Sequence, residues 1–321
     1  MAAATIVAGA ITLLFAIMGP YLARRLPPAT ATRLLVPASL VVAGSGVWVL
    51  TAVAFTWVAQ LGPVSRYGDW SAEELRADTP FPTTVAVSCG VLAVLSLSRT
   101  ATVGTRRVRV LLAVRQCCRE VGTPGSLVVL DHERPDAFAT PGASGRIVIT
   151  TGLLRALSAD ERRALLAHEA SHLAHRHVLW LLAADLASAA NPLLARTVRA
   201  MGHAVERWAD EDAAQEVTDR RLVARTLART ALLTRSASSS TAPPSTAPTP
   251  LKLAATGGDV PGRVRALLEP PPRPRFVPLA VLLVLLIAST VAAGTVQHRG
   301  DQLLDQAGTT PTVSHHPSKS R

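Results

Sequence analysis

The residues of this chain that are best suited to chemistry lie in the segment His168-Glu169-Ala170-Ser171-His172. Because His168 and His172 are four positions apart, their imidazoles project from the same face of a helix, one turn apart. Two imidazole nitrogens so placed can bind one Zn²⁺ at about 2.0–2.1 Å. Glu169 lies on the side where a water on the metal would sit, so it can take a proton from that water and deliver it to a leaving amine. The motif predicts zinc-dependent hydrolysis of peptide bonds.

The flanks of the motif add to its weight, because chance alone produces this pattern in about one chain in a hundred of this length. Ala167 and Leu173 are uncharged, as expected for a helix beneath an active site. His175 could touch the same face as His172, but a third ligand so close on one helix is geometrically awkward. His177 is interpreted as a helix-end residue that the helix dipole favours.

A catalytic zinc ion needs a third protein ligand and an open position. We expect Glu206 to be that ligand, since it lies 34 residues after His172 on the next long helix. Asp210, one turn later on the same face, could hold the outer nitrogen of a ligand histidine. The alternative is a solvated acidic face. Against it, Asp185 is the only acidic residue between Glu169 and Glu206, so few other ligands exist.

The composition indicates a membrane protein. Hydrophobic residues make up 49% of the chain and charged residues only 17%, too few to cover a water-facing surface. The net charge of +11 does not predict nucleic-acid binding, because the arginines cluster beside apolar runs and no recognised nucleic-acid motif accompanies them. The expected partner is therefore the lipid bilayer, and no nucleic acid is expected.

Four apolar segments are predicted to cross the membrane, at about residues 5–23, 34–61, 84–97 and 276–296. If all four cross, every basic loop falls on one side, which the positive-inside rule makes cytoplasmic. Both termini are then extracellular in a multi-pass protein of the cell membrane. The domains expected are three spans in residues 1–98, a cytoplasmic domain in 99–275, the fourth span, and a disordered extracellular tail, 297–321.

Within residues 99–275 the pattern predicts a helix at 106–121 and short strands at 127–130 and 146–150. Ser158 and Glu161 form a capping box that opens the helix carrying the motif. The apolar stretch 178–194 is expected to be a buried or interfacial helix rather than a span. A further helix is expected at about 196–235, followed by a flexible linker, 236–250, of low complexity.

Four segments of this region resemble the catalytic core of the HtpX-like and BlaR/MecR-like membrane gluzincins. They are Pro135-Asp-Ala-Phe-Ala139, Ile147-Val-Ile-Thr-Thr-Gly-Leu-Leu154, Leu157-Ser-Ala-Asp-Glu161 and Leu165-Leu-Ala-His-Glu-Ala-Ser-His172. The resemblance covers about residues 127–214, a later Arg263-Val-Arg-Ala-Leu-Leu268 also fits, and Asp136 replaces an Asn of the family pattern.

The resemblance implies a mainly α membrane protein with an α+β gluzincin-type metalloprotease domain between its third and fourth spans. It also implies that residues 146–151 form the edge strand beside the cleft. An extended substrate would then pair with the backbone there, although the segment could equally be an ordinary sheet strand. The substrate-binding residues expected on this basis are Ile147, Val148, Ile149 and Thr150.

The spans resemble the transducer half of BlaR/MecR-type sensors, but only some two dozen polar residues follow the last span and they hold no Ser-x-x-Lys motif. The expectation is therefore a stand-alone zinc endopeptidase that cleaves a repressor-type cytoplasmic regulator or a damaged membrane protein. The alternative is a non-catalytic signalling or scaffold protein with a structural zinc site. Structural sites usually close all four positions, commonly with Cys, which favours catalysis.

Overall fold

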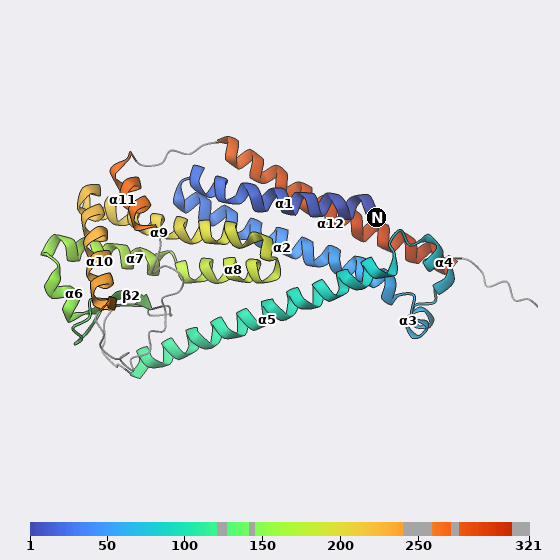
Figure 1. The fold of residues 1–321 in the computed structure, drawn as a ribbon, viewed down its shortest axis with the longest axis horizontal. Helices are drawn as coiled ribbons and strands as arrows, with labels where there is room; N and C mark the ends of the chain where they lie inside the picture. The colour runs from blue at the N-terminus through green and yellow to red at the C-terminus, as the bar shows by residue number, and fades with distance from the viewer. Residues whose placement is uncertain (121–126, 141–144, 240–258, 271–275, 310–321) are drawn as a thin grey trace, which may run out of the picture.

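Four long apolar helices dominate the computed structural model, which describes residues 1–120, 127–140, 145–239, 259–270 and 276–309. They are α1 (Ala2–Arg25), α2 (Pro28–Val58), α5 (Thr83–Glu120) and α12 (Phe276–Thr309). Each is long and apolar enough to cross a membrane. The smaller domain lies at one end of these helices, between α5 and α12 in the chain (Figure 1). The predicted fold class, mainly α with four apolar spans around an inserted α+β domain, is confirmed.

Helix α5 differs from the prediction, which placed a short span at 84–97 and a separate helix at 106–121. The two are one helix of 38 residues. The connecting residues contain no proline, and the hydroxyls of Thr102 and Thr105 donate to the carbonyls of Ser98 and Ala101 four positions earlier. These local bonds keep the threonines compatible with a helix, so the chain has no reason to break there.

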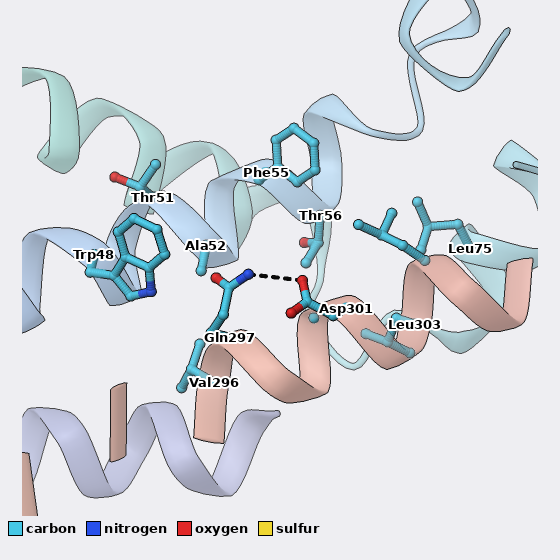
Figure 2. Close-up of a pocket in the computed structure, with 12 residues that line it drawn as sticks. Trp48, Thr51, Ala52, Phe55, Thr56, Leu75, Val296, Gln297, Asp301 and Leu303 are labelled. Carbon is cyan, nitrogen blue, oxygen red and sulfur yellow. Dashed lines mark hydrogen bonds between the residues drawn. The ribbon is translucent and has the colours of Figure 1, made fainter. Parts of the chain in front are cut away.

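The predicted disordered tail, 297–321, is wrong as far as Thr309, because α12 continues to that residue. Its last turns are held by α4 (Ala72–Asp78), where Leu75 and Ala307 are both buried in one cluster. Short helix α3 (Gly62–Tyr67) precedes α4. Figure 2 shows Leu75 and Leu303 at this end, beside a cavity of about 190 Å³ between α2, α4 and α12. Residues 310–321 lie outside the described part of the chain.

The sheet of the inserted domain has three strands in the order β1-β3-β2. The predicted strands β1 (Leu127–Leu130) and β3 (Arg146–Thr150) are confirmed, and the prediction missed β2 (Ala137–Thr140). Strand β3 pairs in parallel with β1 and antiparallel with β2, with Phe138 opposite Val148. The prediction of an edge strand at 146–151 is therefore wrong. Ile147–Thr150 have neighbours on both sides, and their backbone is not free to pair with a substrate.

Seven further helical elements complete the described part of the inserted domain, and α6 and α7 among them pack on the sheet. The motif lies on α7, which begins with the predicted capping box: Ser158 accepts from the Glu161 amide, and the Glu161 carboxylate accepts from the Ser158 amide. The seven elements are α6 (Thr151–Ala156), α7 (Ala159–Ala174), α8 (His177–Ala190), 3-10 helix η1 (Pro192–Leu194), α9 (Ala195–Val217), α10 (Arg220–Ser239) and α11 (Val260–Leu268).

The long helix predicted at 196–235 is two helices. Thr218 adopts a left-handed conformation with φ 55°, and Asp219 then accepts a hydrogen bond from the Leu222 amide at 2.9 Å. An Asp in this position caps a new helix, so α10 starts in a new direction. The predicted linker at 236–250 overlaps the end of α10, which reaches Ser239, and residues 240–258 lie outside the described part of the chain.

The inserted domain and the spans share one hydrophobic core. Buried residues of α1, α2 and α12 form a single cluster with buried residues of α8, η1 and α9. Helix α9 approaches α1 closely because Gly19 leaves room for the fully buried Thr197, whose hydroxyl donates to the Ala16 carbonyl at 3.4 Å. A Cβ at Gly19 would lie only 2.4 Å from the Thr197 side chain.

We predict that Gly19→Val destabilises the protein by about 1–3 kcal/mol, because the new side chain must push α9 away from α1. Gly9→Val on the same helix is the control, since a side chain there meets nothing within 4 Å. Thermal unfolding of both variants in the same detergent tests this expectation. Equal melting temperatures for the two variants would show that the α1–α9 contact is not tightly packed.

Candidate metal centre

Three side chains converge on one point between α7 and α9. The Nε2 atoms of His168 and His172 are 3.2 Å apart, and each lies 3.7 Å from a carboxylate oxygen of Glu206. All three donor atoms lie within 4.8 Å of one another. The structure thus brings together the three residues that the sequence predicted as ligands, and they form a candidate site for one metal ion.

Small buried residues let α7 and α9 come close enough to share this site. Ala164 of α7 and Ala213 of α9 are almost fully buried in one cluster, which Leu267 of α11 joins. On the same face of α9, Glu206 and Asp210 are also buried. The predicted alternative, a solvated acidic face, therefore does not describe these two residues. Both carboxylates need partners inside the protein.

Arg263 is the main partner of the two buried carboxylates. Its Nε and Nη2 donate to the two oxygens of Asp210 at 2.7 and 2.6 Å, and its Nη1 lies 3.1 Å from Glu206. Burial by itself raises the pKa of Asp210, but the hydrogen bonds and charge of Arg263 outweigh it, so the pKa lies well below its ordinary value. Sequence reasoning noted the segment around Arg263 and gave the residue no role.

Asp210 in turn lies beside the first histidine, with 3.1 Å between its Oδ1 and His168 Nδ1. Asp210 can accept a hydrogen bond from the Nδ1–H of His168, which leaves Nε2 of His168 facing the other donors. Burial lowers the pKa of His168, but the hydrogen bond and charge of Asp210 raise it by more. For His172, burial and the neighbouring His168 both lower the pKa, which favours the neutral imidazole that binds metals.

His177 is the outer partner of the second histidine, and it begins α8 instead of ending the helix that carries the motif, so the dipole of that helix does not explain it. It is 1% exposed, and its Nδ1 lies 2.9 Å from Nδ1 of His172. Burial, followed by the nearby histidines, lowers its pKa to about 2, so it is neutral. The Nδ1 of a neutral His177 can accept a hydrogen bond from the Nδ1–H of His172, which leaves Nε2 of His172 for a metal. Sequence spacing gives no signal for this contact, because α7 ends and α8 begins between the two residues.

His175 points away from the other donors. Its Nε2 is 2.9 Å from Asp212, which also accepts a 2.6 Å hydrogen bond from Ser171. Its ring stacks on Trp208, and the guanidinium of Arg33 on α2 lies 4.6 Å from the centre of the Trp208 ring. The alternative of His175 as third ligand therefore has no support in the geometry. The contact with Arg33 links the site to a membrane helix.

Glu169 is buried beside the three donors, with 8% of its surface exposed. Burial raises its pKa above the ordinary value, and the nearby Glu206 adds to that, while His168 opposes it. The backbone N–H of Ala139 in β2 faces this carboxylate and also opposes the rise of its pKa. The strand that the prediction missed thus contacts the residue predicted to be the base.

Strand β2 presents its free side to Glu169. The Thr150 amide donates to the Asp136 carbonyl, and bonded and non-bonded pairs alternate along an antiparallel ladder. Phe138 therefore turns its backbone groups toward β3, whereas those of Ala139 turn outward. No strand of the described chain pairs with that outer side. The open edge beside the candidate metal site is β2.

Comparisons with known proteins agree with this geometry. Residues 106–210 match the family model described as Peptidase family M48. That segment holds the sheet, both histidines, Glu169, Glu206 and Asp210, so the similarity to M48 peptidases covers the whole candidate site.

Several curated relatives are named "Protease HtpX homolog". The one from Aeropyrum pernix is 44% identical over 88 residues, which are 26% of this chain and 28% of the relative. The one from Thermoplasma acidophilum is 47% identical over 60 residues, which are 18% of this chain and 19% of the relative. The one from Acidiphilium cryptum is 39% identical over 85 residues, which are 25% of this chain and 30% of the relative. The matches thus span less than a third of these relatives. No solved structure matches the chain. The predicted resemblance to HtpX-like membrane metalloproteases is confirmed.

We predict that Arg263→Met weakens metal binding 10- to 100-fold and lowers stability by about 3–5 kcal/mol, because Asp210 stays buried without its cation. Arg265→Met is the control, since Arg265 is on the same helix but exposed. Chelator competition and thermal unfolding measure the two effects. Equal metal affinity in both variants would contradict the role given to Arg263.

Proposed function

We propose that the protein is a membrane-embedded zinc-dependent endopeptidase that hydrolyses peptide bonds of a protein substrate. The observation that carries the proposal is the convergence of His168, His172 and Glu206 beside the buried carboxylate of Glu169. Zn–N and Zn–O bonds of about 2.0–2.1 Å at tetrahedral angles place donors about 3.3 Å apart. The separations of 3.2 and 3.7 Å between the side-chain donors are close to that value. The donor set therefore fits Zn²⁺.

The same set argues against a structural zinc site in a scaffold protein. Structural sites close four positions, most often with Cys. Among the described residues no fourth His, Cys, Asp or Glu joins the three donors. Three protein ligands with a carboxylate next to them are the pattern of a hydrolytic zinc site.

A bound zinc ion would supply a Lewis acid that polarises a peptide carbonyl and lowers the pKa of water. Glu169 takes a proton from the attacking water and passes it to the leaving amine. Its burial suits both tasks, because a raised pKa makes the carboxylate a stronger base toward water. The same raised pKa lets the carboxyl group hold the proton until it passes to the amine. Asp210 and His177 hold the outer nitrogens of His168 and His172, so that both rings keep their Nε2 atoms directed inward.

For the substrate, we propose the outer side of β2 as the binding edge in place of Ile147–Thr150. An extended peptide that pairs with β2 gains backbone hydrogen bonds and passes beside Glu169. Such pairing recognises any extended sequence. This agrees with a protease that acts on unfolded segments, such as those of damaged membrane proteins, or on a repressor-type regulator.

We also propose that the peptidase domain faces the cytoplasm and that both termini face outward. The basic loops support this orientation, since Arg24, Arg25 and Arg33 lie at the same end of α1 and α2 as the zinc site. The arrangement restricts substrates to cytoplasmic proteins and to the cytoplasmic parts of membrane proteins.

The test of the catalytic role is Glu169→Gln in the full chain. We predict a loss of casein hydrolysis of at least 1,000-fold with unchanged zinc content, because the amide cannot accept the proton. Glu216→Gln, an exposed residue at the end of α9, is the control and should keep full activity. Glu206→Ala should lose zinc as well as activity.

Two results would contradict these roles. Proteolysis by the Glu169→Gln protein would exclude Glu169 as the base. Full zinc occupancy in Glu206→Ala would exclude Glu206 as a ligand. A wild-type protein with one bound zinc and no hydrolysis of any unfolded protein would instead favour the structural-site alternative.

The proposed substrate edge has its own test, Ala139→Pro. Proline removes only the outward N–H of β2, which edge strands tolerate because the bonds to β3 remain. We expect a loss of activity of 10-fold or more with zinc content and melting temperature nearly unchanged, since both the contact to Glu169 and the pairing edge are lost. Normal turnover of unfolded casein by this variant would show that the substrate does not use β2.

A further inference from the structure

Helices α8 and α9 form a hairpin that reaches between the membrane helices. Helix α8 packs on α2 and α5, and α9 packs on α1 and α2. Figure 1 shows both helices running alongside α2, with the turn between them pointing toward the middle of the helix bundle. The turn consists of Asn191 and the 3-10 helix that follows it.

Helix α1 gives a first measure of how far the hairpin extends. Thr197, near the start of α9, contacts Ala16 and Gly19 of α1. These residues precede Arg25, the last residue of α1, by nine and six positions. At 1.5 Å per residue, Thr197 lies about 9–14 Å beyond the basic end of α1.

Helix α2 gives a second, independent measure. The side-chain amide nitrogen of Asn191 lies 3.7 Å from where a Cβ of Gly46 would be. Gly46 follows Arg33, the basic residue at the same end of α2, by 13 positions. That is about 20 Å along the helix, against about 30 Å for the hydrocarbon core of a bilayer. The first measure places Thr197 within the leaflet that adjoins the peptidase domain, and the second places Asn191 near the bilayer midplane.

The exposed face of the hairpin combines an apolar tip with two cations. Leu193 in the turn is 55% exposed. Arg196 and Arg199 lie three positions apart on α9 and are both exposed, on the side opposite the buried Thr197 and Met201. No carboxylate in the described part of the chain pairs with either guanidinium. Two unpaired arginines just behind an apolar tip are typical of elements that lie in the lipid interface.

We propose that Arg196 and Arg199 form a binding site for the headgroup of an anionic phospholipid. Charged groups at this depth are costly unless they meet an opposite charge, and the lipid phosphate level is within reach of long arginine side chains. The guanidinium fork matches the paired oxygens of a phosphate. The hairpin is then a re-entrant element, and α9 carries the lipid site on the same helix as Glu206 and Asp210.

The test compares lipid binding by the full-length protein and two double variants. Arg196→Gln/Arg199→Gln removes the proposed site, and Arg221→Gln/Arg225→Gln makes the same charge change on exposed positions of α10, which packs on the peptidase domain alone. Native mass spectrometry in detergent measures retention of phosphatidylglycerol against phosphatidylcholine with the same acyl chains. We expect the preference for phosphatidylglycerol to fall about 30-fold in the first variant only.

A second measurement reports the depth of the turn. A fluorophore on Leu193→Cys, in a chain without the three native cysteines, should be quenched by spin-labelled lipid, whereas one on Glu216→Cys should not. Equal loss of lipid preference in both double variants, or no quenching at position 193, would overturn the proposal. Displacement of phosphatidylglycerol by millimolar inorganic phosphate would also overturn it, because the site would then take a free anion. None of these readouts depends on peptidase activity.

Discussion

Burying the carboxylates of Glu206 and Asp210 is the constraint on which the rest of the structure depends. An unpaired buried charge costs several kcal/mol, so each carboxylate must meet a cation or a strong donor. Arg263 meets both, although it comes from α11, beyond residues 240–258. Asp210 Oδ1 is shared between Arg263 and Nδ1 of His168. The contacts of His168 with Asp210 and of His172 with His177 are both compatible with this arrangement of Arg263 and the two carboxylates.

Helix α9 connects two environments that usually belong to separate domains. Its first turns lie among α1 and α2, where Thr197 fits over Gly19, and its middle turns carry Glu206 and Asp210. Trp208, in the same turns as Glu206 and Asp210, has His175 stacked on its ring and Arg33 of α2 near it. Arg33, Trp208 and His175 therefore form a continuous set of contacts from α2 through α9 to the end of α7. The membrane helices are part of the framework that positions the site.

The parts that could be predicted from sequence are those governed by local spacing. Apolar length predicted the four spans, and β-branched residues with flanking Gly and Pro predicted two strands. The capping box and the pairing of His168 with His172 followed from spacings of three and four residues on a helix. What failed needed long-range information. Ala137–Thr140 is a short strand without an alternating pattern, so β2 was missed and β3 was taken for the edge. Arg263 and His177 contact the site only through tertiary packing. The continuity of α5 depends on the absence of a proline between its two predicted segments, and no residue pattern marks it.

The position of Arg263 has a consequence for how the protein is made. It follows Glu206 by 57 residues, so synthesis completes α7 and α9 well before their cation exists. Until α11 emerges, Asp210 and Glu206 can avoid unpaired burial only by staying hydrated or by taking up protons. The inserted domain therefore cannot close around Glu206 and Asp210 until α11 has left the ribosome.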